Sequence, residues 1–135
     1  MILLDTHVMV WLVEGLDLLG KRALELIEEN EDELRVSAIS FWEMAMLTEK
    51  HRIALRSPLP RWKNTALIRS GIVTVPMDGE IALQAGALPG TIHGCPADRI
   101  VIATARELAC PLLTIDRAIL LYGGQGHVQA IDARL

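Results

Sequence analysis

Four carboxylates in this chain lie where the sequence predicts that a strand ends or a helix begins. They are Asp5 after the run Ile2-Leu3-Leu4, Asp116 after Leu112-Leu113-Thr114-Ile115, Glu43 three residues after Ser40, and Asp98 two residues after Pro96. Acids that converge repel one another, so such a group needs a cation. Oxygen ligands suit Mg²⁺ or Mn²⁺, and phosphodiester hydrolysis is the chemistry that most often uses such a cluster.

Each of these acids also has a purely structural explanation. Asp5 and Asp116 have the residue type and position of helix N-caps. Glu43 has the spacing from Ser40 of a capping box, in which two side chains satisfy backbone N–H groups. Asp98 in a first helical turn is stabilised by the helix dipole. We favour the metal site because several of these acids fall at one end of the predicted sheet, where little else neutralises them.

The elements that must position the acids alternate between short apolar runs and amphipathic stretches. We expect strands at residues 2–4, 35–37, 72–75, 112–115 and 127–131. We expect helices at residues 6–13, 20–30, 40–51, 61–70, 78–87, 96–108 and 117–122, with Pro58 and Pro60 in the loop before the fourth. This alternation predicts an α/β fold with a mainly parallel sheet and helices on both faces. Ligands of such sheets bind at the carboxyl ends of the strands, where the acids are expected to meet.

The composition is that of one domain spanning residues 1–135, with 51% hydrophobic residues and a net charge of −4. No apolar run approaches the roughly 18 residues of a membrane helix, and the N-terminus lacks a signal-peptide pattern, so we expect a cytoplasmic protein. Cys95 and Cys110 are expected to be free thiols. The apolar excess forms either a thick core or a surface that a partner covers, and we favour a partner.

Charge is distributed unevenly along the chain. Residues 25–33 carry six acids and no base, whereas residues 50–69 carry six bases and no acid. Within this basic segment, Arg56, Arg61 and Lys63 are our candidates for contacts to a nucleic-acid backbone. Trp62 stands among them and either stacks on a base or packs inside. Two solvated helix faces of opposite sign would explain the same distribution.

Four segments together resemble the PIN-domain family and, within it, the toxin ribonucleases of the VapC type. The segments are Ile2-Leu3-Leu4-Asp5-Thr6-His7, Val36-Ser37-Ala38-Ile39-Ser40-Phe41-Trp42-Glu43, His93-Gly94-Cys95-Pro96-Ala97-Asp98-Arg99 with Ala103-Thr104-Ala105, and Leu113-Thr114-Ile115-Asp116. They follow the family's order and spacing over essentially the full length. The resemblance implies a three-layer α/β/α fold and an endoribonuclease that depends on Mg²⁺ or Mn²⁺. It further implies a homodimer and a cognate antitoxin whose C-terminal segment binds over the active site.

The resemblance also implies roles for particular residues. The metal-binding and catalytic acids are expected to be Asp5, Glu43, Asp98 and Asp116. Thr6 and Thr114 stand beside two of these acids and are expected to orient them through their hydroxyls. Ser40 and Arg99 are expected to position an acid or to contact the substrate.

One position departs from the family pattern. The family commonly has an aspartate where this chain has Cys95, three residues before Asp98. We expect activity to survive this change and the affinity or preference for metals to be altered. His93 and Cys95 come from one loop, which by itself does not predict a zinc site, and the other three histidines add no suitable spacing.

Two other functions are open from the sequence. A catalytically weakened PIN-like module would bind RNA or a partner without cutting, although the retention of all four acids argues against this. A phosphatase or receiver-type domain would need a second acid beside Asp5, where this chain has Thr6 and His7.

Overall fold

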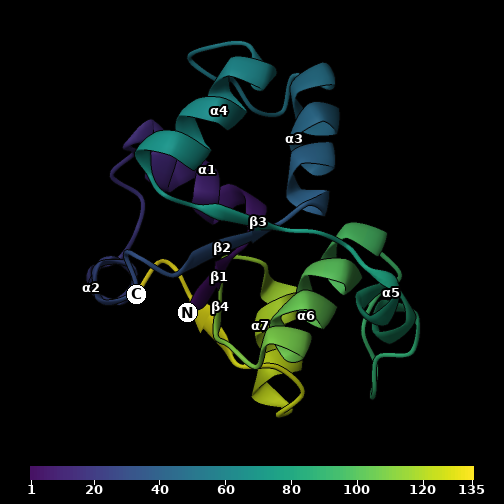
Figure 1. The fold of residues 1–135 in the computed structure, drawn as a ribbon. Helices are drawn as coiled ribbons and strands as arrows, with labels where there is room; N and C mark the ends of the chain where they lie inside the picture. The colour runs from purple at the N-terminus through teal and green to yellow at the C-terminus, as the bar shows by residue number, and fades with distance from the viewer.

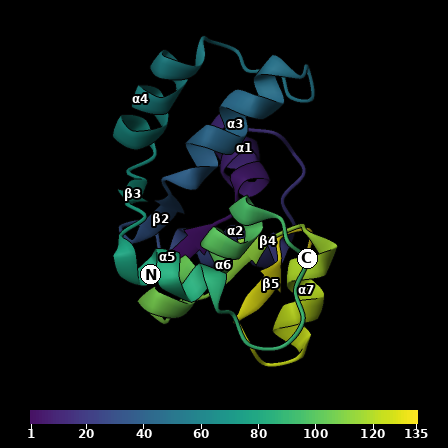
Figure 2. The same ribbon diagram turned by 90° about the vertical axis from the view of Figure 1, so that its right-hand side faces the viewer.

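The computed structural model describes all 135 residues and contains a five-stranded parallel sheet (Figures 1 and 2). The strands are β1 (Ile2–Leu4), β2 (Leu34–Ser37), β3 (Val73–Val75), β4 (Leu112–Thr114) and β5 (Ala130–Asp132). Their order across the sheet is β3-β2-β1-β4-β5, and every neighbouring pair is parallel. The α/β fold with a parallel sheet predicted from the sequence is therefore confirmed, and β1 lies at its centre.

Seven helices cover the two faces of this sheet. They are α1 (Thr6–Glu14), α2 (Lys21–Glu29), α3 (Ile39–Glu49), α4 (Leu59–Arg69), α5 (Gly79–Gly86), α6 (Pro96–Leu108) and α7 (Arg117–Gly124). In Figure 1, α1, α3 and α4 lie above the sheet and α5, α6 and α7 below it, which gives three layers. No helix is long and apolar enough to cross a membrane.

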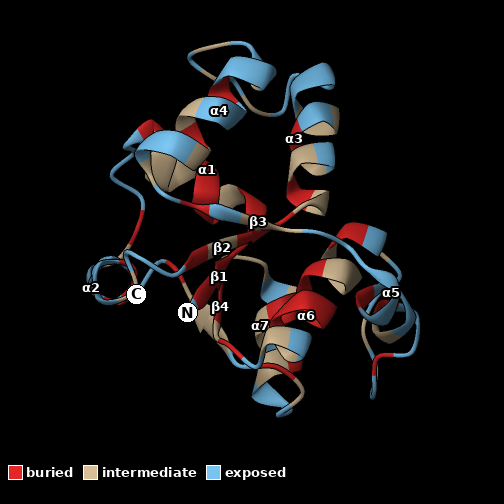
Figure 3. Cartoon of the chain, viewed as in Figure 1, coloured by how far each residue is buried: buried red, intermediate tan, exposed pale blue.

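Alternate side chains of the short strands point into two hydrophobic cores. In Figure 3, parts of β1, β2 and α6 are coloured as buried. Ile2 and Leu4 point into the first core with α1, α2 and α4, whereas Leu3 points into the second core with α5, α6 and α7. All three side chains are completely buried. A strand buried on both faces reads as a continuous apolar run, which is why the sequence of β1 lacks polar alternation. This central strand ends directly at Asp5, so the first acid has a rigid support.

Three local predictions were wrong at helix boundaries. Ser40 does not cap α3, because the helix begins at Ile39 and the Ser37 hydroxyl accepts from the Ile39 N–H instead. The helix α4 begins at Leu59, with Pro60 in its first turn, where the missing N–H of proline costs nothing. At the other end of the chain, α7 continues through the two glycines at 123–124, and β5 begins only at residue 130.

Candidate active site

All four predicted acids line one hollow of about 370 Å³ at the carboxyl end of the sheet. Asp5 follows β1, Asp116 follows β4, Glu43 lies in the second turn of α3, and Asp98 lies in the first turn of α6. Glu43 was expected one turn earlier in its helix, but it still lines the hollow. A larger hollow of about 650 Å³ lies at the other end of α6 and contains no carboxylate. The chemistry of the lining, and not the volume, therefore identifies the site.

Asp5 is the most firmly held of the four acids. Its Oδ1 accepts from the Thr6 N–H at 2.8 Å, and its Oδ2 accepts from the Thr114 hydroxyl at 2.6 Å. The same Thr114 oxygen accepts from the Asp116 N–H at 3.0 Å. Thr114 therefore couples the ends of β1 and β4.

The hydroxyls of Thr6 and Ser40 form a second link, between α1 and α3. Thr6 donates to Ser40 at 2.9 Å, and both residues are buried, Ser40 completely. Ser40 lies one turn before Glu43 in α3, so this bond fixes the helix that carries the third acid. Because no surface of Ser40 is exposed, it positions α3 and does not reach a substrate.

The surroundings of Asp5 and Asp98 favour the protonated forms of these carboxyl groups. Burial, followed by repulsion from Asp116, Asp5 and Glu43, raises the pKa of Asp98 to about 6 from 3.8. Burial likewise raises the pKa of Asp5, although the bonds from Thr114 and Thr6 lower it. His93 is the only base in ion-pair contact with one of the four acids, with its Nε2 3.2 Å from the Asp98 Oδ2. The acids therefore lack the positive charge that would neutralise them all.

The chemistry of these donors suits a hard divalent cation, although no three of the four acids have ligand atoms within 4.8 Å of one another, so their side chains must move closer to share one ion. The four acids supply only oxygen ligands, and they come from elements that the two cores hold rigid. Mg²⁺ and Mn²⁺ prefer such ligands and would remove the repulsion that raises the carboxylate pKa values. Asp5 and Asp116 cap α1 and α7 as well, so the capping and metal-site explanations hold together for them.

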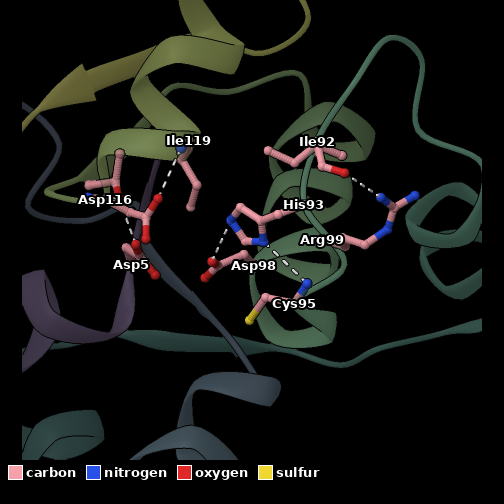
Figure 4. A network of polar contacts seen from close by, with 9 residues as sticks. Asp5, Ile92, His93, Cys95, Asp98, Arg99, Asp116 and Ile119 are labelled. Atoms are coloured by element: carbon pink, nitrogen blue, oxygen red, sulfur yellow. Dashed lines mark hydrogen bonds and ion pairs between the residues drawn. The ribbon is translucent and has the colours of Figure 1, made fainter.

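The structure does not bring Arg99 to the hollow (Figure 4). Its Nε donates to the Ala85 carbonyl at 2.9 Å, and its Nη1 and Nη2 donate to Ile92 and Gly86 at 3.4 and 3.5 Å. These carbonyls belong to the last turns of α5 and the loop before α6. Arg99 therefore anchors the loop that leads into α6.

Four further residues line the hollow: His7, Cys95, Ile115 and Arg117. The sequence pointed to Cys95, which stands where the family commonly has an aspartate, but it assigned no site role to Ile115 or Arg117, whose only signal is that each adjoins Asp116. His93 was missed for a different reason, because its contact with Asp98 depends on the path of the preceding loop. In Figure 4, His93 contacts both Cys95 and Asp98 and lies on the side of Asp98 that faces away from Asp5 and Asp116.

The basic segment, residues 50–69, comprises the loop after α3 and the helix α4. Trp62 is 2% exposed, and its indole donates to the buried Glu14 carboxylate at 3.3 Å, so stacking on a base is excluded for it. Arg56 is bound to the same Glu14 through its backbone N–H and its Nε. Arg61 is exposed, as is Lys63, whose Nζ lies 5.7 Å from the centre of the Phe41 ring.

Comparisons with known proteins agree with this geometry. The PIN domain family model matches residues 2–124. Ribonuclease VapC22 of Mycobacterium tuberculosis is 39% identical over 118 residues, which cover 87% of this chain and 88% of that protein. VapBC2 from Rickettsia felis, bound to a promoter DNA fragment, shares the fold with a TM-score of 0.68 at 17% identity, covering 97% of this chain and 98% of the other. A toxin–antitoxin complex from Klebsiella pneumoniae has a TM-score of 0.65 at 19% identity, covering 98% of each chain. This chain belongs to the PIN domain family.

Proposed function

We propose that this protein is an endoribonuclease, the toxin of a toxin–antitoxin pair, and that residues 1–135 act as one catalytic domain. The observation that carries the proposal is the convergence of Asp5, Glu43, Asp98 and Asp116 on one hollow with too few basic groups to neutralise them all. The sequence relative named as a ribonuclease supports the same reaction. Hydrolysis of an RNA phosphodiester bond is the reaction that such a carboxylate group serves.

The four acids are the residues that would hold Mg²⁺ or Mn²⁺. When bound, such an ion supplies Lewis-acid activation of water and offsets the charge of the phosphodiester. Thr114 holds the Asp5 carboxylate in one orientation, and the bond between Thr6 and Ser40 holds α3 with Glu43. A ligand set fixed in this way loses little freedom on binding an ion, which raises affinity.

The exposed part of the basic segment is the best surface for the RNA backbone. Arg61 and Lys63 lie on α4, beside the helix α3 that carries Glu43 (Figure 1). Arg56 is partly neutralised by Glu14, so we assign it a smaller share of phosphate binding. A positive surface next to an acidic hollow lets a polyanion approach a site that would otherwise repel it.

A partner fits the exposed apolar surface, as expected from the composition. Trp42, next to Glu43 in sequence, is 50% exposed, and Ile68 and Leu83 are 81% and 74% exposed. Contiguous exposed apolar surface marks sites that bind other proteins, and of these three residues only Trp42 lies beside an acid of the hollow. We therefore propose a cognate antitoxin that covers the hollow, and a homodimer, in the cytoplasm; solved relatives of the same fold include toxin–antitoxin complexes.

The test is cleavage of total RNA by the purified protein, free of antitoxin, with Mg²⁺ or Mn²⁺ and with EDTA. We expect cuts only with metal, and sequencing of the new ends then identifies the target. The Asp5→Asn variant should lose cleavage. The matched control is Asp132→Asn, because Asp132 lies at the end of β5, is bound by Arg134, and does not line the hollow.

Two results would contradict the proposal. Cleavage that persists in EDTA, or in the Asp5→Asn variant, would place the reaction elsewhere. A folded protein that binds metal and RNA but cuts nothing would instead support the non-cutting binding module.

A further inference from the structure

A nitrogen, a sulfur and an oxygen donor come together beside the carboxylates. One ligand atom from each of His93, Cys95 and Asp98 lies within 4.8 Å of the other two. The His93 Nε2 is already 3.2 Å from the Asp98 Oδ2. Figure 4 shows the Cys95 sulfur on the same side of the α6 start as the Asp98 carboxylate.

This donor set differs in kind from the four carboxylates. Imidazole and thiolate are ligands for Zn²⁺ and other late transition metals, whereas Mg²⁺ prefers oxygen alone. Three protein ligands leave a fourth, tetrahedral position for water. The site is open to solvent, because the side chains of His93 and Asp98 are 38% and 15% exposed.

The loop that carries the donors is fixed at both ends. Pro96 begins α6 directly after Cys95, and Arg99 in the same helix holds the Ile92 carbonyl. The Cys95 N–H donates to the His93 Nδ1 at 3.1 Å, which turns the Nε2 toward Asp98. The donors are therefore arranged before any ion binds, apart from small adjustments.

We propose that His93, Cys95 and Asp98 form a Zn²⁺ site whose occupancy inhibits the nuclease by withdrawing Asp98 from the carboxylate pocket. The inhibition rests on the proposed function, whereas Zn²⁺ binding does not. Asp98 belongs to both ligand sets, so Zn²⁺ and Mg²⁺ compete for it. Zn²⁺ binds thiolate and imidazole more strongly than Mg²⁺ or Mn²⁺ does, so low Zn²⁺ concentrations suffice.

One rearrangement must accompany binding. A metal on the His93 Nε2 needs the imidazole proton on Nδ1, where the structure has an acceptor for the Cys95 N–H. The imidazole proton must therefore move from Nε2 to Nδ1, and the Cys95 backbone N–H must then donate to water instead of to His93. The loss of this bond weakens the site relative to a fully preformed one.

The binding test uses the full chain, stripped of metal and kept reduced. Co²⁺ serves as a spectroscopic probe, because a bound thiolate gives an intense charge-transfer absorption, and Zn²⁺ should then abolish this signal by displacement. Calorimetry should show one Zn²⁺ per chain, weakened roughly 100-fold or more in Cys95→Ser and in His93→Gln. Cys110→Ser is the matched control, because Cys110 is a buried thiol at the other end of α6 and should change nothing.

The outcomes separate this site from the carboxylate pocket. A thiolate absorption that is lost in Cys95→Ser and kept in Asp5→Asn supports the proposal. Absence of the absorption, or Zn²⁺ binding unchanged in both Cys95→Ser and His93→Gln, overturns it. Circular dichroism of each variant shows whether it is folded. If Cys95→Ser is not folded, Cys95→Ala takes its place.

The inhibition test adds Zn²⁺ to the Mg²⁺-dependent cleavage assay. The Zn²⁺ concentration that half-inhibits cleavage should be at least about tenfold lower for the unsubstituted protein than for the Cys95→Ser variant. Equal inhibition of both would refute the regulatory part. If the unchanged protein does not cleave RNA at all, the proposed function fails, and the binding measurements still decide whether the Zn²⁺ site exists.

Discussion

Replacing Asp98 by asparagine should stabilise the metal-free protein at neutral pH, although it removes a proposed metal ligand. Burial and three neighbouring carboxylates raise the pKa of Asp98 to about 6 from 3.8. A carboxyl that binds its proton more tightly in the folded state contributes stability that is complete below about pH 4 and is lost as the pH rises through about 6. The difference between these pKa values, at about 1.36 kcal/mol per pKa unit, gives about 3 kcal/mol near pH 7.5.

Urea unfolding in EDTA, at a series of pH values between about 5 and 8, measures this effect. The free energy of unfolding of the Asp98→Asn variant should exceed that of the unsubstituted protein by up to about 3 kcal/mol near pH 7.5, which corresponds to roughly 10 °C in Tm. The gain should shrink as the pH falls toward 5, and the lost contact with His93 reduces it. Mg²⁺ at about 1,000 times its Kd should reverse the order, because it stabilises only the protein that binds it, by about 4.1 kcal/mol.

A control of opposite sign is available in Asp132. Hydrogen bonds from Arg134 lower the pKa of Asp132, so its contribution to stability is present at neutral pH and is lost on acidification. The Asp132→Asn variant should therefore be slightly less stable at neutral pH and equal at low pH. The reasoning is refuted if Asp98→Asn is no more stable than the unchanged protein in EDTA at any pH above 6.

Three further predictions concern the supports of the site. Thr114→Val removes the hydroxyl bond to Asp5 and should weaken Mg²⁺ binding in calorimetry by about tenfold or more, whereas Thr114→Ser should not. Glu14→Ala leaves a buried indole and a backbone N–H without their acceptor and should cost about 1–3 kcal/mol in urea unfolding. Replacing both Arg61 and Lys63 by glutamine should make the salt dependence of RNA binding shallower by about 1.4 in slope, and an unchanged slope would exclude them as phosphate contacts.

The fold could be predicted because its signals are local. The run of residues 2–4 has the apolar character of a strand buried on both faces, and Pro96 marks the observed first residue of α6. Alternation of strand and helix then forces a parallel sheet, whose carboxyl ends meet at one edge. The four acids could be predicted for the same reason, since their positions follow from where the elements end.

Two of the wrong predictions involve partners far away in the sequence. Ser40 has the spacing of a cap, but its hydroxyl bonds to Thr6, 34 residues away. Trp62 stands among basic residues, but Glu14, 48 residues away, draws its indole into the core. Local spacing cannot report such contacts, because they depend on how helices pack. Buried polar groups must find a partner somewhere, and only the tertiary structure shows which one.

The four acids differ in what they do for the fold, and this decides how each can be tested. Asp5 and Asp116 cap α1 and α7 through their side chains, whereas Asp98 caps no helix. Asparagine caps a helix as well as aspartate does, whereas alanine costs about 0.5–2 kcal/mol. Asparagine at Asp5 or Asp116 therefore removes the charge and keeps the cap. At Asp5 its amide nitrogen cannot accept from the Thr114 hydroxyl, so Asp116→Asn separates metal binding from structure more cleanly. Alanine at either of these positions would confound the two roles, whereas at Asp98 there is no cap to disturb.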